Sequence, residues 1–152
     1  MIRFWLFVHL LGFTMWLGGG LASMVAGMAA KREDRASLGP LVRSQAAVQR
    51  AIVGPGALLT VLSGLILTFS VSGRTGELAG FNLALVVMQG AGLVGALLAL
   101  MVALPTAAKL GRLDPIGPGS DYFDELRQRQ KIVTSVAGTL GFIALVAGSM
   151  VR

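Results

Sequence analysis

The chain has 152 residues, of which 55% are hydrophobic and only 13% are charged, and its net charge is +6. A typical soluble domain carries about 25% charged residues and leaves much of its surface in water, so this composition excludes an ordinary soluble fold. The basic residues crowd the ends of apolar segments, which is typical of membrane topology signals and argues against a nucleic-acid partner. The chain has no cysteine, which excludes disulfides and thiolate metal sites.

Four segments contain no Asp, Glu, Lys or Arg. They are 27, 23, 31 and 20 residues long and cover 4–30, 51–73, 78–108 and 132–151. A helix needs about 20 apolar residues to cross a hydrocarbon core of about 30 Å. The pattern predicts an all-α fold, an integral membrane four-helix bundle in a single transmembrane domain, with helices at about 2–28, 45–70, 81–108 and 128–151.

The first expected helix, 2–28, has the alternative interpretation of a secretory signal peptide, because small residues follow it. Its apolar stretch is longer than the roughly 7–15 residues of a signal peptide's apolar region. The basic cluster at 31–35 would also resist translocation. We therefore expect this helix to be retained.

The connections between the helices predict the orientation. Loops 29–44 and 109–127, with the helix ends beside them, hold ten basic residues, against three on the opposite side. The ten are Lys31, Arg32, Arg35, Arg43, Arg50, Lys109, Arg112, Arg127, Arg129 and Lys131, and the three are Arg3, Arg74 and Arg152. The positive-inside rule then places both basic loops in the cytoplasm and both termini outside, in a multi-pass protein of the bacterial inner membrane.

Turn-forming residues punctuate the two basic loops. Residues 38–40, Leu-Gly-Pro, are expected to break the first loop, and 41–50 then forms a short amphipathic lead into the second helix. The link at 114–119 is rich in Pro and Gly, and Ser120 is the expected N-cap of an extension that continues into the fourth helix.

Small residues at four-residue spacing predict close helix packing. They are Ala91, Gly95, Ala99 and Ala103; Ala137 with Gly141 and Ala144 with Gly148; and Gly20 and Ser23 with Gly27. One stripe could serve a second copy of the chain or a larger membrane complex. Two prolines within apolar segments, Pro55 and Pro105, should each bend their helix on the cytoplasmic side.

The single histidine, His9, is the principal candidate for a functional site. It lies about 12 Å inside the outer end of the first helix, where an ionisable group is costly and indicates function. Trp16 lies on its helix face, and Gln89 and Ser63 are expected at a similar depth, so these four residues form the candidate cofactor-binding layer. The structural alternative is a neutral histidine that Gln89 or Ser63 satisfies, which would only fasten helices together.

Among functional interpretations, a haem iron ligand suits His9 best, because an apolar bundle with nearby aromatic residues and glycines can hold a porphyrin. The expected cofactor is haem b. One histidine supplies one axial ligand, so a second would come from Met15, Met24, Met88 or another protomer's His9. Copper held by His9 and methionine is less favoured, because no methionine-rich metal motif is present.

Basic side chains that border one leaflet are expected to contact anionic lipid headgroups, at about 1 kcal/mol for each residue. They are Arg43, Arg50, Lys109, Arg112, Arg127, Arg129 and Lys131.

The string from His9 to Gly19, HLLGFTMWLGG, resembles the first-helix signature of a group of small bacterial membrane proteins. The group comprises an uncharacterised predicted four-helix integral membrane family, the copper-resistance D family and, more remotely, the HemJ-type protoporphyrinogen oxidases. In the second helix, Arg50, Pro55 and Ser63-Gly64 follow the order seen in the uncharacterised family. The resemblance implies that His9 corresponds to the first-helix histidine, which in the HemJ type is linked to haem binding.

The sequence thus favours an inner-membrane protein that binds haem or a metal through His9 in a redox or tetrapyrrole-related role. A non-catalytic accessory subunit of a larger membrane complex is the first alternative. A small-molecule or ion transporter is the second, and the lack of carboxylates within the helices disfavours it.

Overall fold

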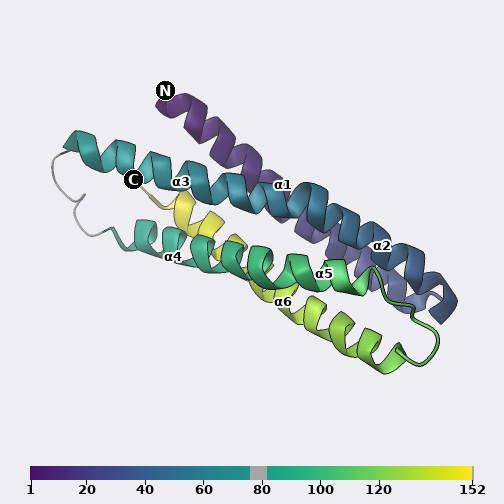
Figure 1. The fold of residues 1–152 in the computed structure, drawn as a ribbon. Helices are drawn as coiled ribbons and strands as arrows, with labels where there is room; N and C mark the ends of the chain where they lie inside the picture. Colours follow the sequence, from purple (N-terminus) through teal and green to yellow (C-terminus); the bar gives the residue numbers. More distant parts are fainter. Residues whose placement is uncertain (76–81, 152) are drawn as a thin grey trace.

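The computed structural model describes residues 1–75 and 82–151, and that part of the chain forms helices joined by short turns (Figure 1). The order of the elements is α1 (Ile2–Ala29), η1 (Ala30–Arg32), η2 (Arg35–Ser37), α2 (Leu38–Val48), η3 (Gln49–Val53), α3 (Gly54–Thr75), α4 (Leu83–Leu98), η4 (Ala99–Ala103), α5 (Leu104–Leu110) and α6 (Ser120–Ser149). Four helical stretches are long and apolar enough to cross a membrane: Ile2–Ala29, Arg35–Ser70, Leu83–Leu110 and Ser120–Ser149. The prediction of an all-α chain with four such helices is confirmed.

The second span begins earlier than expected. Helix α2 starts at Leu38, whereas the sequence predicted a helix from residue 45 and a break at 38–40. Pro40 is compatible with this start, because the first turn of a helix leaves its N–H groups without intrahelical partners. The third span was expected from Phe81, which lies outside the described residues, and α4 begins at Leu83 after the N-cap Asn82.

The last span begins at Ser120, where the sequence placed the start of a helical extension, but the predicted cap is wrong by one residue. Gly119 is the N-cap, and no side chain caps the helix. Asp121 lies in the first turn, where its negative charge interacts favourably with the positive end of the helix dipole.

The helices pack as two main pairs, α1 with α3 and α4 with α6, and α1 also contacts α6. Helix α1 begins at the end of the bundle where α6 finishes, and the turns at 30–37 and 111–119 lie at the opposite end (Figure 1). We call that opposite end the basic end, since the ten basic residues of the two loops belong to it. Arg152, counted on the other side, lies outside the described residues.

The interior of the membrane-spanning part consists mainly of small residues around one large side chain. Trp16 is 2% exposed and packs in one cluster with Val53, Ala57, Ala96, Ala99 and Ala137. Large apolar side chains lie outside instead, and Phe69 and Met101 are 74% and 72% exposed. This distribution suits a lipid environment, in which close helix approach replaces burial of large side chains as the source of packing energy.

The predicted small-residue stripes on the third and fourth spans lie at a helix interface. A Cβ on Gly95 would lie 3.1 Å from the carbonyl oxygen of Ala137 and from the end of the Trp16 indole. Ala99, Ala137 and Ala144 are buried. On the first span the outcome differs, because nothing approaches within 4 Å of a Cβ on Gly20, whereas Gly19 is buried.

The closest helix approach joins α1 and α3 through two glycines. A Cβ on Gly56 would lie 2.6 Å from the Trp16 nitrogen and 2.7 Å from the Gly12 oxygen. A Cβ on Gly12 would lie 2.8 Å from the Thr60 nitrogen. Only glycine permits this backbone-to-backbone contact, which fixes the relative height of α1 and α3 and hence of the side chains above it.

Both prolines of the apolar segments follow a π-helical segment. Segment η3 precedes Pro55 and segment η4 precedes Pro105, and in each the last bond joins an N–H to the carbonyl five residues earlier. Leu104, just before Pro105, packs against Gly54, just before Pro55. Segment η3 contacts α5 and segment η4 contacts α3, and each segment accommodates a proline that has no N–H to donate.

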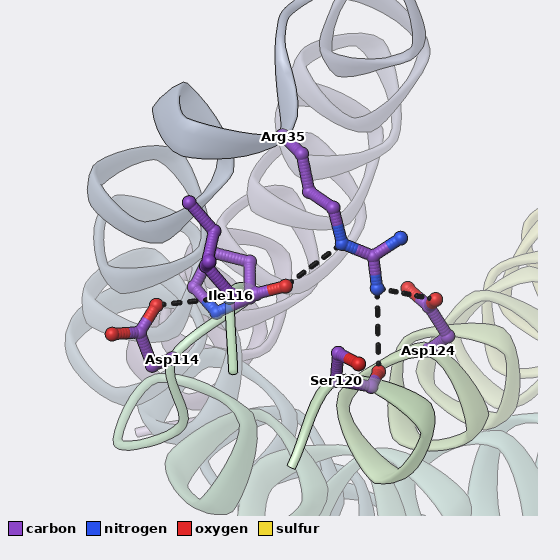
Figure 2. Close-up of polar contacts among 6 residues, drawn as sticks. Arg35, Asp114, Ile116, Ser120 and Asp124 are labelled. Carbon is purple, nitrogen blue, oxygen red and sulfur yellow. Dashed lines mark hydrogen bonds and ion pairs between the residues drawn. The ribbon is translucent and has the colours of Figure 1, made fainter. Parts of the chain in front are cut away.

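The basic end is closed by a second cluster of buried side chains, which we call the cap. It consists of Ala30, Leu38, Val42, Leu110, Phe123 and Leu126. Arg35 ties the two loops together, donating to the Pro115 carbonyl (2.8 Å) and forming an ion pair with Asp124 (2.7 Å), as Figure 2 shows. It also reaches the Ser120 carbonyl at 3.5 Å. These contacts hold the start of α6 against the loop that follows α1.

Candidate functional site

His9 lies half-buried on α1 and points its ring toward α3. Its Nδ1 is 2.9 Å from the Thr60 carbonyl oxygen and 3.2 Å from the Ser63 hydroxyl. The Ser63 hydroxyl itself donates to the Leu59 carbonyl oxygen. Since both groups facing Nδ1 are then acceptors, Nδ1 is the donor and the proton of the neutral imidazole lies on it.

This arrangement leaves Nε2 as the unprotonated nitrogen of the neutral ring. Nε2 makes no hydrogen bond with the side chains of 1–30, 32–70 or 82–151 or with the described backbone. The fully buried polar atoms that lack a partner in this part of the chain belong to Ser23, Gln49 and Gln130, and His9 Nε2 is not among them. Its lone pair is therefore not sealed in the fully buried part of the bundle.

Gly64 provides the space that the imidazole occupies. A Cβ on Gly64 would lie 3.1 Å from His9 Cε1 and 3.3 Å from Nδ1. With Thr60 one turn earlier and Ser63 directly before it, Gly64 completes a shallow seat on α3 for the edge of the ring. The seat follows from the Gly12–Gly56 contact, which lies about one turn further into the bundle from His9.

Gln89 does not join His9. Its side-chain nitrogen donates to the Thr68 hydroxyl at 2.9 Å, and Thr68 donates to the Gly64 carbonyl at 2.9 Å. The expected single polar layer is thus two separate contacts on α3: His9 with Thr60 and Ser63, and Gln89 with Thr68. Both fasten neighbouring helices to α3.

Trp16 lies in the small-residue core and does not line an open site. Its indole end reaches between Gly95 of α4 and Gly141 of α6. Phe13 packs against it edge to face, with ring centroids 6.0 Å apart. The buried position of Trp16 is explained by its packing role, and the structure gives it no exposed face toward a ligand beside His9.

The methionines considered as second ligands are engaged elsewhere or distant. The Met88 sulfur lies 3.0 Å from where a Cβ added to Gly148 would be, and the Met15 Cβ lies 2.8 Å from where a Cβ added to Gly56 would be. Met24 is 52% exposed and lies 15 residues further along α1. Within the described residues no group of three or more His, Asp or Glu could hold a metal ion.

Two surface grooves lie at the two ends of the bundle, and His9 lines neither. One, of about 570 Å³, is lined by Met1, Ile2, Arg3 and Ser70. The other, of about 430 Å³, lies at the basic end between the second and third spans. The donor set around His9 therefore fits one axial ligand offered at the bundle surface, and it does not fit a six-coordinate haem enclosed within a single copy.

The basic residues expected near lipid headgroups all lie toward the basic end. Arg43, Arg50, Lys109, Arg112, Arg129 and Lys131 are exposed, and Arg127 is half-exposed. None of them takes part in the Arg35–Asp124 ion pair, which is the one found in the described part of the chain.

Sequence reasoning missed two residues of the His9 seat, Thr60 and Gly64. Thr60 contributes its backbone carbonyl, and because every residue has one, the residue type gives no signal for this contact. The signal that could have found it is helical spacing, since Thr60, Ser63 and Gly64 lie at offsets of three and four on one face of α3. Gly64 was noted only as part of a resemblance.

Comparisons of the chain with family models, with curated proteins and with solved structures found no match.

Proposed function

We propose that the protein is a multi-pass protein of the bacterial inner membrane that binds haem b through His9 Nε2, in a redox or tetrapyrrole-related role. The observation that carries the proposal is the Nδ1 donation to the Thr60 carbonyl at 2.9 Å. Histidines that bind metals almost always donate their other ring N–H to a carbonyl or carboxylate, which fixes the tautomer and the ring orientation.

Four further features support this choice. The Ser63 hydroxyl accepts a second contact from Nδ1, and Gly64 lets the ring lie against α3. His9 is only partly buried and lines neither groove, so a porphyrin would be held at the bundle surface, with a second copy of the chain as the source of any further ligand. The resemblance of the first-helix string to haem-linked families favours the same residue.

Bound haem would supply one-electron chemistry, and the chain's own residues would orient its ligand and exclude water. Thr60 and Ser63 would hold the imidazole in one tautomer, and the apolar side chains around α1 would keep the site dry. In this proposal the basic end lies in the cytoplasm, which places His9 in the outer half of the membrane.

The test is the visible spectrum of the full chain, purified in mild detergent from haem-supplemented cells, oxidised and reduced. We expect a Soret band that His9→Ala abolishes. The matched control is Gln89→Leu, which removes the other polar contact on α3 but leaves the His9 seat intact, and it should keep the band. Gly64→Ala should shift the band, because the added Cβ presses on the imidazole. A Soret band that survives His9→Ala would overturn the proposal.

An accessory subunit of a larger membrane complex is the second candidate. Gly18 and Gly90 are exposed within spans, and nothing approaches within 4 Å of a Cβ at either position. Such positions would let a partner helix come close. Colourless protein that contains no metal would favour this candidate, whereas colourless protein with bound copper would favour a copper role for His9.

A further inference from the structure

We propose that the groove at the basic end binds one anionic phospholipid, with the headgroup at Arg50 and an acyl chain along the third span. The walls include Ala46 and Arg50 of the second span and Met101, Leu104, Pro105 and Ala108 of the third. We call it the bulge groove. The proposal depends only on the four membrane spans and is independent of the His9 proposal.

The bulge groove lies between the second and third spans, where η3 contacts α5 and η4 contacts α3. Arg50 belongs to η3 and Met101 to η4, and Leu104 packs against Gly54 across the gap between them. π-Helical segments are rare, and those that occur often lie at functional sites. Small side chains on both sides, Ala46 and Ala108, leave the space open.

The floor of the groove suits an acyl chain. Its exposed surface is mainly apolar, and Met101, which forms part of it, is 72% exposed. The volume of about 430 Å³ falls within the range of about 300–1,000 Å³ usual for small-molecule sites. An exposed methionine can adapt to the shape of a flexible chain.

The charge of the groove specifies the headgroup. Arg50 is exposed and no carboxylate lines the groove. Along the second span the same face continues to Arg43, seven positions before Arg50, and on the third span Arg112 lies in the turn just after α5 ends at Leu110. The two helices meet there, since a Cβ on Gly111 would lie 3.1 Å from the Ala46 Cβ and 3.9 Å from the Arg43 Cα.

Arg50 lines the apolar groove, and Arg43 and Arg112 lie further toward the basic end. This arrangement matches an anionic headgroup above an acyl chain. Basic pockets between spans bind anionic lipid headgroups in this way. A guanidinium also binds phosphate oxygens in a bidentate manner, which a zwitterionic lipid satisfies less well because its own ammonium competes.

The experiment is native mass spectrometry of the full chain in mild detergent, titrated with phosphatidylglycerol or with phosphatidylcholine of the same acyl chains. We expect one phosphatidylglycerol to bind with at least fivefold lower Kd than phosphatidylcholine. Arg50→Gln should weaken phosphatidylglycerol binding about fivefold, as expected for loss of about 1 kcal/mol from one basic residue. Arg129→Gln removes the same charge from α6, outside the groove, and should change the Kd less than twofold.

Two further variants test the acyl-chain part. Ala108→Leu fills the groove and Met101→Ser makes its wall polar. Met101 is 72% exposed and Ala108 is partly exposed, so neither change falls in the buried core. Each should weaken phosphatidylglycerol binding at least threefold while far-UV circular dichroism stays unchanged. Equal losses in Arg50→Gln and Arg129→Gln, equal binding of the two lipids, or unchanged binding in both groove variants would each overturn the proposal.

Discussion

The core within the membrane and the cap at the basic end solve the packing problem in opposite ways. Inside the membrane the buried residues are mostly Ala and Gly around Trp16. The cap buries Leu38, Phe123 and Leu126, as the core of a small soluble domain would. The difference follows from the solvent: lipid gives no reward for hiding a large apolar side chain, whereas water does.

Each region is therefore sensitive to a different change. The membrane core depends on backbone proximity and should suffer when a small side chain grows. The cap depends on buried volume and should suffer when a large side chain shrinks.

The largest effect is expected for Phe123→Ala in the cap. Phe123 is fully buried, and truncation of such a side chain costs about 3–5 kcal/mol. Hydrogen exchange should show lost protection at 30–48 and 120–126 with protection of 54–70 retained, because the two clusters are separate. Tyr122→Ala is the matched control, since Tyr122 is 50% exposed, and it should leave exchange unchanged. Equal loss of protection across all four spans would show that the cap is not a distinct unit.

The next effect is expected for Gly56→Ala in the membrane core. The added Cβ would contact backbone atoms of Trp16 and Gly12, so α1 must move, and overpacking of this kind costs about 1–3 kcal/mol. The unfolding temperature in detergent should fall, and tryptophan fluorescence should change as Trp16 shifts. Gly18→Ala adds the same methyl group where nothing lies within 4 Å, and it should not lower stability. If both variants behave alike, close approach is not what holds α1 to α3.

The smallest effect is expected for Arg35→Gln, which removes the tie between the loops. The ion pair with Asp124 is about half-exposed on both sides, and such pairs contribute about 0.2–1 kcal/mol. We expect faster proteolysis within 111–119 and little change in the unfolding temperature. The exposed Arg32 allows a control of equal charge, Arg32→Gln, and the difference between the two variants should shrink at high salt. A large drop in unfolding temperature would mean that the tie, and not the apolar cap, holds this end together.

The number of spans was predictable because each contains a long stretch without Asp, Glu, Lys or Arg, although the second and fourth spans begin before that stretch. The cap was not, since Leu38 and Phe123 are far apart in the chain and nothing local indicates that they meet. Pro40 misled the prediction of the helix start, because a proline near the first turn costs nothing there.

The candidate site was only partly predictable. His9 and Ser63 were expected at one depth and do meet, because charge-free helices of known direction set approximate heights. Gln89 was expected at the same depth and contacts Thr68 instead. Height follows from counting residues, but the rotation of each helix about its axis depends on packing at glycines such as Gly56, which periodicity does not specify.

The π-helical segment η3 has a consequence for that rotation. It holds one residue more than an α-helical turn requires, and one residue turns an α-helix by about 100°. Deleting a single residue between Gln49 and Val53 would convert the wide turn into a regular α-helical turn and leave Thr60 and Ser63 facing His9. A deletion between Gly56 and Thr60 has no wide turn to absorb it, and it would rotate Thr60 and Ser63 by about 100° away from His9. Among related chains, a one-residue gap within 49–53 is therefore compatible with an intact seat, whereas a gap within 57–59 would mark members whose histidine lacks it.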